Sequence, residues 1–393
     1  MISVLFLYGQ IQKNIRKITF YNNYLKQRGD TKMKKWLSVF IFLLAVSSMS
    51  VQAQDFTLKS GSYQSGTYAG DNEEDYNYYM VKTNKKGYLA ITAKTSDHKN
   101  LFVDICDQNK QVVASDISIE DKKTVLHACD KSKVYYIRVK GTQGITYKIS
   151  YKITTLDLKY AKKYTYTVTN ASLQEKQQVV IPMKVSNSGI LHFMVNTSNP
   201  LIVKYYNSKK KAVSENATMI KKDLSGIGIA SKGKYYVHLY NPENTTIGTT
   251  TLKDIKYQVD NVFTIRNGSK GKAKSLSKGK YVRMLVPAGK KTTAWFKIRI
   301  TKKQKLNISI DSQMMQNNGK NLQLYICNNK GKKLNVNPII INGESSVIYK
   351  KKYIMKYPKT VFGTTSAFPK GTYYIKVESK TKTSSGAFKI KWN

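Results

Sequence analysis

A short strand-like phrase built around a pair of tyrosines occurs three times along this chain. The copies are residues 134–139 (VYYIRV), 233–239 (GKYYVHL) and 371–377 (GTYYIKV). In each copy, β-branched and aromatic residues alternate with polar or basic ones, which is the period of a strand with one buried face. Three copies predict three structural repeats, and the phrase itself contains no catalytic group.

Other strand-like stretches accompany each tyrosine pair in a fixed order, with Asn/Ser/Gly/Lys turn residues after the second of them. They are 87–93, 101–106 and 147–151 around the first pair, 189–195, 201–206 and 255–259 around the second, and 305–310, 322–327 and 388–392 around the third. Four strand types in one order, found three times, indicate that the whole unit is repeated.

The spacing of the repeats predicts one domain for each. Tyr136, Tyr236 and Tyr374 lie 100 and 138 residues apart. A chain of about 100 residues can bury its own core, and short strands separated by turn signals are typical of an antiparallel β-sandwich. We therefore expect an all-β protein with three tandem domains. Their predicted bounds are 54–157 (repeat 1), 158–262 (repeat 2) and 281–393 (repeat 3), with a flexible Lys/Gly/Ser linker over 263–280.

Repeat 1 carries motifs at 75–79 (DYNYY), 87–91 (GYLAI), 134–139 and 147–149 (YKI). This series resembles the bacterial pre-peptidase C-terminal domain family, best over 56–153 and less well in the other repeats. The resemblance implies tandem jelly-roll-like β-sandwich domains of the kind that accompany secreted enzymes, and relatives bind collagen or glycans. Because the shared motifs are mostly core and turn positions, they concern the fold more than the activity.

Residues 33–53 have the three parts of a secretory signal peptide. Lys34 and Lys35 form the basic end, 36–46 is an apolar run, and 51–53 is a small-residue cleavage site. The apolar run is shorter than the about 20 residues that span a bilayer, so an uncleaved anchor is the weaker interpretation. We expect a secreted protein, or one held non-covalently at the cell surface, with no transmembrane segment in the mature chain.

Residues 1–32 precede this signal, although a signal peptide belongs at the amino terminus. Residues 28–30 (RGD) can be encoded by a purine-rich ribosome-binding site just upstream of Met33. We therefore expect translation to begin at Met33 and 1–32 to be a wrongly assigned start. A disordered extension or an RGD adhesion tripeptide is the alternative.

Positive charge rises steeply along the chain. There are 15 Lys/Arg and 13 Asp/Glu over 55–157 (net +2), 15 and 5 over 158–259 (net +10), and 29 and 4 over 260–393 (net +25). The asymmetry between repeats is more informative than the total of +44.

Clustered lysines of repeat 3 are the predicted polyanion-binding residues. An excess of lysine over arginine suits diffuse attraction to polyanions better than bidentate recognition. Outside the cell the candidate partners are anionic cell-wall polymers, glycans or phospholipid headgroups, and export argues against nucleic acid. A lysine-rich surface that only keeps the protein soluble is the alternative. The residues are Lys290, Lys291, Lys302, Lys303, Lys305, Lys330, Lys332, Lys333, Lys350, Lys351 and Lys352.

An acidic turn before the first predicted strand of repeat 1 is a candidate calcium site, because clustered carboxylates on a loop are what Ca²⁺ requires. A solvated turn is the simpler interpretation, since the other repeats lack the cluster. No other cofactor is expected. The residues are Asp71, Glu73, Glu74 and Asp75.

Cys106 and Cys129 are a candidate disulfide of an exported protein, although exported proteins of Gram-positive bacteria often lack disulfides. Cys106 and Cys327 occupy the same place in their repeats, where repeat 2 has Tyr206. That equivalence indicates a strand side-chain position instead of a redox or metal motif.

Together these features predict a secreted, non-catalytic binding protein whose third repeat is retained on anionic cell-wall or glycan polymers. The histidines have no metal-binding spacing and no nucleophile motif is present. An accessory or inhibitory partner of a separately encoded secreted peptidase or glycosidase is the alternative. A hydrolase with unrecognised carboxylates is a third interpretation.

Overall fold

The computed structural model describes residues 55–68, 70, 76–96, 101–214, 217–262, 266–315, 322–335, 337–341, 348–358, 364–365 and 367–393. The description below concerns the unit Asp55–Asn393. The predicted signal peptide, the stretch before it and the acidic turn at Asp71, Glu73, Glu74 and Asp75 lie outside the described residues.

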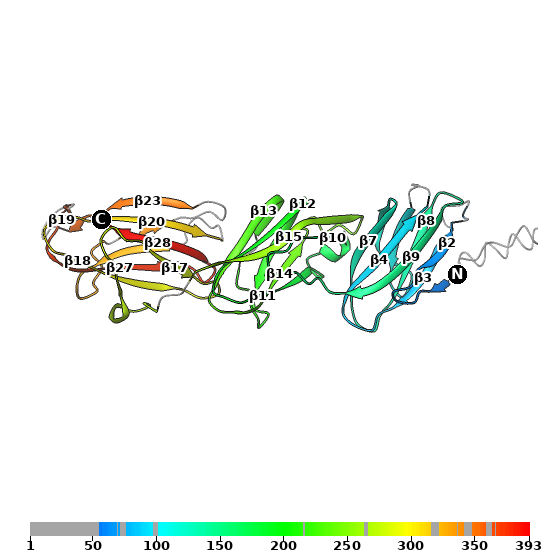
Figure 1. The fold of residues 1–393 in the computed structure, drawn as a ribbon, viewed down its shortest axis with the longest axis horizontal. Helices are drawn as coiled ribbons and strands as arrows, with labels where there is room; N and C mark the ends of the chain where they lie inside the picture. Colours follow the sequence, from blue (N-terminus) through cyan, green and yellow to red (C-terminus); the bar gives the residue numbers. More distant parts are fainter. Residues whose placement is uncertain are drawn as a thin grey trace, which may run out of the picture. The chain divides into compact units, whose positions relative to one another are not determined.

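The described part of the chain is built from β-strands, joined by turns and two short 3₁₀ helices, η1 (Asn170–Leu173) and η2 (Lys270–Lys272) (Figure 1). Within it, no helix has the length and apolar character needed to cross a membrane. The predicted all-β class is confirmed, and the strands form several sheets that make up more than one β-sandwich unit.

Repeat 1 contains a five-stranded sheet and the strands of a second sheet that faces it. The first sheet has the order β1 (Asp55–Thr57), β3 (Asn77–Lys82), β8 (Val134–Gly141), β5 (Leu101–Cys106), β6 (Val112–Ile119). The second has β7 (Lys122–Cys129), β4 (Gly87–Thr95), β9 (Thr146–Thr154) and β2 (Gln64–Thr67). Side chains from both sheets form one core, including Val81, Ile91 and Ile137.

Repeat 2 continues this second sheet, so that ten strands form one hydrogen-bonded series. Its strands are β10 (Tyr164–Thr169), β11 (Val179–Val185), β12 (Gly189–Tyr206), β13 (Ala217–Ile229), β14 (Gly233–Tyr240) and β15 (Thr249–Asn261). The long strand β12 pairs with β13 along most of its length, and also with β15 over residues 189–196 and with β14 over residues 202–206.

Repeat 3 has its own pair of larger sheets around its own core. The five-stranded sheet has the order β16 (Lys274–Ser275), β18 (Thr293–Ile300), β27 (Gly371–Ser379), β21 (Leu322–Cys327), β22 (Ile339–Ile341). The four-stranded sheet has the order β17 (Val282–Val286), β28 (Gly386–Trp392), β20 (Asn307–Met314), β23 (Tyr349–Ile354). Four two-residue strands complete it: β19 (Gln304–Lys305), β24 (Tyr357–Pro358), β25 (Thr364–Thr365) and β26 (Ala367–Phe368).

The tyrosine-pair phrases form the central strands β8, β14 and β27. In each copy the first tyrosine packs on the core and the next alternating residue, Ile137, Val237 or Ile375, is fully buried. The second tyrosine faces outward, opposite Cys106, Tyr206 or Cys327 in the neighbouring strand. This register confirms that the two cysteines and Tyr206 hold equivalent strand positions.

Repeats 1 and 2 share hydrogen bonds and apolar contacts. Val168 of β10 bridges Leu126 of β7 in parallel register, which joins the two parts of the ten-stranded sheet. The Nδ1 of His127 and the Oγ1 of Thr169 are 2.9 Å apart. The amide of Ala128 donates to the Oγ of Ser172 at 2.7 Å. These contacts satisfy buried polar groups from both repeats, so the junction is a packed interface.

Repeat 3 begins earlier than the sequence predicts. Within the predicted linker 263–280, Lys274 of β16 pairs in parallel with Phe296 of β18, as β1 pairs with β3 in repeat 1. Asn267 is buried and its amide donates to the carbonyl of Trp295 at 2.9 Å. The flexible-linker prediction is therefore wrong for 266–280, because a ladder of backbone hydrogen bonds needs no apolar side chains.

Repeats 2 and 3 also touch through a small apolar cluster that includes Ile190, Leu285 and Met315. The carbonyl of Gly228 accepts a hydrogen bond from the amide of Ala288 at 2.9 Å. A Cβ at Gly228 would lie 2.3 Å from the carbonyl oxygen of Val286, so this close backbone approach requires glycine.

Acid is expected to weaken the fold through His127 at the junction of repeats 1 and 2. Burial lowers the pKa of this imidazole from 6.5 to about 4. The unfolded chain therefore binds the proton first. The free energy of unfolding is highest above pH 6.5 and falls as the pH drops toward 4, by on the order of 3 kcal/mol from this group. Urea unfolding at pH 7 and pH 4.5 measures the difference.

The variant His127→Gln keeps a polar partner for Thr169 and cannot titrate, so its difference between the two pH values should be smaller. Burial also lowers the pKa of His192 and His238, so part of the dependence will remain. An unchanged difference in the variant would show that His127 does not sense pH.

Candidate ligand-binding surface

The eleven predicted lysines of repeat 3 are all exposed. They do not come from one element, however, but from four segments distributed over two sheets. Lys290 and Lys291 lie between β17 and β18, Lys302, Lys303 and Lys305 between β18 and β20, Lys330, Lys332 and Lys333 after β21, and Lys350, Lys351 and Lys352 on the edge strand β23. Sequence clustering alone therefore does not define a binding face.

The strand register shows that further cations lie on the outer face of the four-stranded sheet. One cross-strand row is Arg283, Lys389, Asp311 and Lys350, and the next is Lys391, Ser309 and Lys352. Residues in such rows lie on one face of a sheet. The predicted binding residues do not include Arg283, Lys389 and Lys391, because each of these lies alone between apolar neighbours in the sequence. Their alternation with buried residues is the signal that could have found them.

The outer face of β18, β27 and β21 combines cations with aromatic rings. Trp295, Lys376 and Tyr325 are directly opposite one another in three adjacent strands. Tyr374, the outward residue of the tyrosine pair, meets Trp295 edge-on with ring centroids 6.3 Å apart. We call this set the aromatic face of repeat 3.

Lysine ammonium groups lie above the rings of the aromatic face. The Nζ of Lys333 is 3.5 Å from the ring centroid of Tyr325. The Nζ of Lys376 is 5.8 Å from the centroids of both Trp295 and Tyr325, and that of Lys270 is 5.8 Å from Tyr374. Such cation–π contacts hold the charges in place on the sheet without neutralising them.

The same face of repeat 1 has rings and cations too, but three of its cations have a carboxylate partner. Lys110 lies over Tyr78 and Tyr136 and is paired with Asp55 at 2.9 Å. Arg138 is paired with Asp104 and Lys140 with Asp116. Much of the positive charge of this face is therefore balanced by carboxylates of the same repeat, which agrees with the low net charge of repeat 1.

In repeat 3, fewer of the lysines on this face have a carboxylate partner. Lys376 is paired with Glu378, whereas Lys270 and Lys333 have no carboxylate partner within the part of the chain that the structure describes. In repeat 2 the corresponding face carries two rings in contact, Tyr206 and His238, with ring centroids 3.9 Å apart and planes tilted by 30°. Burial and then Lys204 lower the pKa of His238 to about 4, so that its imidazole is neutral at pH 7.

The cysteines do not form the predicted disulfide. Cys106 and Cys129 are both free and buried, and they lie on strands of different sheets, β5 and β7. Burial raises the pKa of the Cys106 thiol to about 11 and also raises that of Cys129, so both are poor nucleophiles. Both cysteines are buried strand residues, which explains why they occur within the alternating strand segments of the sequence.

No group of three or more His, Cys, Asp or Glu side chains with a geometry suited to a metal ion occurs among the described residues. The candidate calcium ligands lie outside those residues, so the calcium interpretation stays a prediction.

No protein-family model matches this chain, and no curated protein matches it. The resemblance to the pre-peptidase C-terminal family therefore stays a prediction.

Several solved structures are similar. One is the M60 catalytic domain with two CBM51 domains from Clostridium perfringens ZmpB. It shares 9% sequence identity with this chain, and the match covers 52% of this chain and 38% of that chain, with a TM-score of 0.18. The tandem CBM51 modules of a Streptococcus pneumoniae family 98 glycoside hydrolase share 11% identity over 54% of this chain and 79% of theirs, with a TM-score of 0.18. Tripeptidyl peptidase 2 shares 8% sequence identity, and the match covers 86% of this chain and 32% of that protein, with a TM-score of 0.21. The match thus spans less than half the length of the ZmpB structure and of tripeptidyl peptidase 2.

Breaking the internal neutralisation of repeat 1 is expected to destabilise it. The side chain of Asp104 is fully buried, accepts from Arg138 at 2.6 Å and also accepts from the amide of Asp116. Asp104→Asn leaves a largely buried guanidinium without its counter-charge, and we expect a loss of about 3 kcal/mol in the free energy of unfolding. Denaturant titration measures it.

The matched control is Asp116→Asn, which removes the exposed partner of Lys140 and should change the free energy of unfolding by less than about 1 kcal/mol. Equal losses in the two variants would contradict the distinction between the two ion pairs.

Proposed function

We propose that this chain is an exported, non-catalytic binding protein of three tandem jelly-roll-like β-sandwich domains, whose third repeat binds an anionic cell-wall polymer or glycan. The observation that carries the proposal is the aromatic face of repeat 3, where Lys270 and Lys333 lie over aromatic rings and have no described carboxylate partner. The charge of +25 over 260–393 supports it.

Positioned charges bind better than free ones. A surface lysine normally loses side-chain conformational entropy when it meets an anion. Lys333 is already held on Tyr325, and Lys270 is held by Tyr374 and by a hydrogen bond from its Nζ to the carbonyl of Asn329 at 3.2 Å. Part of the ordering has therefore taken place before a ligand arrives.

Cations on both sheets of repeat 3 favour a polymer over a small anion. The aromatic face belongs to the five-stranded sheet, and the rows that contain Lys389 and Lys391 belong to the four-stranded sheet. A long polyanion can contact many such charges at once, and multiple weak contacts add up to retention.

We also propose that repeat 3 has no catalytic role. Asp311 and Glu378, two of its few carboxylates, lie on strands β20 and β27 of different sheets. Glu378 is moreover paired with Lys376. This arrangement does not offer a general acid and base directed at one point.

The proposal predicts salt-sensitive binding that depends on the aromatic face. The double variant Lys270→Gln with Lys333→Gln should bind heparin, or purified cell walls, about tenfold more weakly than the unaltered chain at low ionic strength. It should also release about two fewer counterions, seen as a shallower slope of log affinity against log salt. Affinity chromatography and titration at several salt concentrations measure both quantities.

The matched control is Lys209→Gln with Lys211→Gln, which removes the same charge from the equivalent turn of repeat 2. That turn is closed by Asn207 as the repeat 3 turn is closed by Asn328. Equal weakening in the control would reduce the effect to net charge alone. Retention that salt does not reverse would contradict the proposal.

A further inference from the structure

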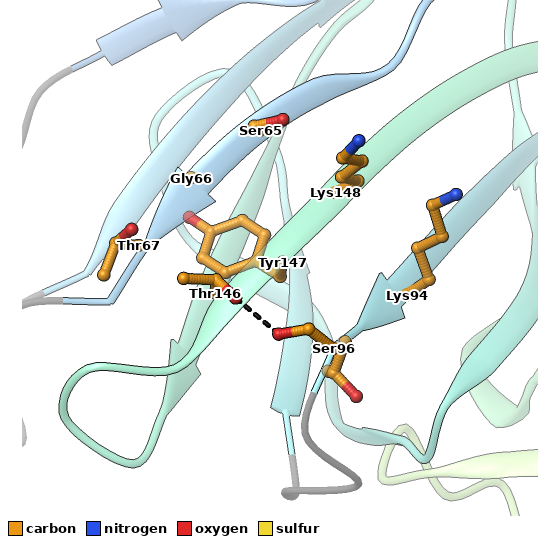
Figure 2. A pocket seen from close by; sticks show the side chains of 9 residues that line it. Ser65, Gly66, Thr67, Lys94, Ser96, Thr146, Tyr147 and Lys148 are labelled. Atoms are coloured by element: carbon orange, nitrogen blue, oxygen red, sulfur yellow. Dashed lines mark hydrogen bonds between the residues drawn. The ribbon is translucent and has the colours of Figure 1, made fainter.

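A hollow of about 630 Å³ opens on repeat 1, over strands β2, β4 and β9. It lies on a different repeat from the aromatic face and includes none of the lysines predicted from the sequence. Figure 2 shows Lys94 and Lys148 extending to the same side of the sheet above it, with Ser65 beside Lys148.

The strand register brings lysines together across the sheet. Ser65 is opposite Lys148, Lys148 is opposite Lys94, and Lys94 is opposite Lys122 of β7. Like charges directly opposite one another repel and destabilise a sheet. None of the described residues that line the hollow is acidic, and no ion pair joins Lys94, Lys122 or Lys148 to a carboxylate among the described residues. The row therefore concentrates positive charge that a bound anion would relieve.

Short hydroxyl side chains form the next row and leave the space beside the lysines. Thr67 is opposite Thr146, and Thr146 and Ser96 are hydrogen-bonded to each other, as the dashed line in Figure 2 marks. Each hydroxyl still has capacity for a further hydrogen bond. Such groups suit the hydroxyl and ring oxygens of a sugar.

The floor of the hollow is rigid. Tyr147 is buried, and its hydroxyl lies 2.8 Å from the hydroxyl of Tyr79 and accepts from the amide of Asn77 at 2.8 Å. A Cβ at Gly66 would lie 2.7 Å from the ring of Tyr147, so β2 rests closely on this ring (Figure 2). The groups above therefore have fixed positions.

An exposed aromatic ring lies near the cations. Tyr63, which precedes β2, is 47% exposed, and the Nζ of Lys94 is 4.9 Å from its ring centroid. The contact holds the ammonium in place, and the exposed part of the ring can stack on an apolar face of a ligand.

We propose that this hollow is a second binding site, specific for an acidic sugar residue. The carboxylate or sulfate of the sugar lies between the ammonium groups of Lys94 and Lys148. Its hydroxyls bond to Ser65, Thr146 and Ser96, and Tyr63 covers one face of the ring. This site is independent of the proposed polymer-binding face of repeat 3, because it recognises one residue in a hollow instead of a charge array.

The test is calorimetric titration of the full-length protein with short probes at moderate salt. The probes are a hyaluronan tetrasaccharide for carboxylate, a heparin tetrasaccharide for sulfate, and a maltotetraose as the neutral probe. We expect at least one acidic probe to bind and the neutral probe not to bind. Lys94→Gln with Lys148→Gln should weaken binding at this site by about a hundredfold, about tenfold for each charged hydrogen bond removed.

Lys152→Gln is the matched control, because Lys152 lies on the same strand and face as Lys148 but opposite Ala90 and outside the hollow. It should bind like the unaltered protein. The repeat 3 variant Lys270→Gln with Lys333→Gln should retain this binding, which separates the two proposals.

Thermal unfolding gives a second readout. Without ligand, Lys94→Gln with Lys148→Gln should leave the melting temperature unchanged or raise it, because it removes a repulsion. The acidic probe should raise the melting temperature of the unaltered protein and not of this variant. Equal binding of the neutral probe, equal loss in Lys152→Gln, or no binding of any probe would overturn the proposal.

Discussion

The two-faced central strand of each repeat is the constraint on which the rest depends. β8, β14 and β27 are hydrogen-bonded to a neighbour on both sides, so their inward residues must be apolar and complementary to the opposite sheet. Their outward residues carry no such demand, and they lie at the middle of an open sheet face. The same backbone thus secures the core and presents Tyr136, Tyr236 or Tyr374 with a basic or imidazole side chain two positions on.

The three repeats use this arrangement differently because of the residues opposite the central strand. Arg138 meets Asp104, His238 meets Lys204, and Lys376 meets Tyr325. Repeat 1 places a buried carboxylate opposite its central cation, whereas repeat 3 places an aromatic ring there and pairs Lys376 with Glu378 on its own strand. The positive charge that the repeat 3 surface keeps is that of Lys270 and Lys333, which lie over rings. Divergence at a few outward positions is therefore enough to give one scaffold different surfaces, whereas the inward positions stay apolar in all three.

Much of the strand order could be predicted from the sequence, because alternation and turn residues are local properties. For example, the sequence pattern alone places Cys106, Tyr206 and Cys327 at the same position of their repeats, and the strand register agrees. The row of Lys94 and Lys148 could not be predicted, since residues 54 positions apart become neighbours only through strand register. The linker prediction for 266–280 is wrong for a related reason, because the composition of this segment is that of a linker, whereas its order comes from pairing with the backbone of β18 and from the burial of Leu276.

The junction at β7 and β10 also has a mechanical consequence. Repeats joined only by a free tether unfold one at a time when the chain is pulled. Here the hydrogen bonds of Ala128 and the buried contacts of Leu126 with the core of repeat 2 must break before β7 or β10 can leave its sheet. Repeats 1 and 2 are thus coupled under load, and a pull on either one is shared by the other.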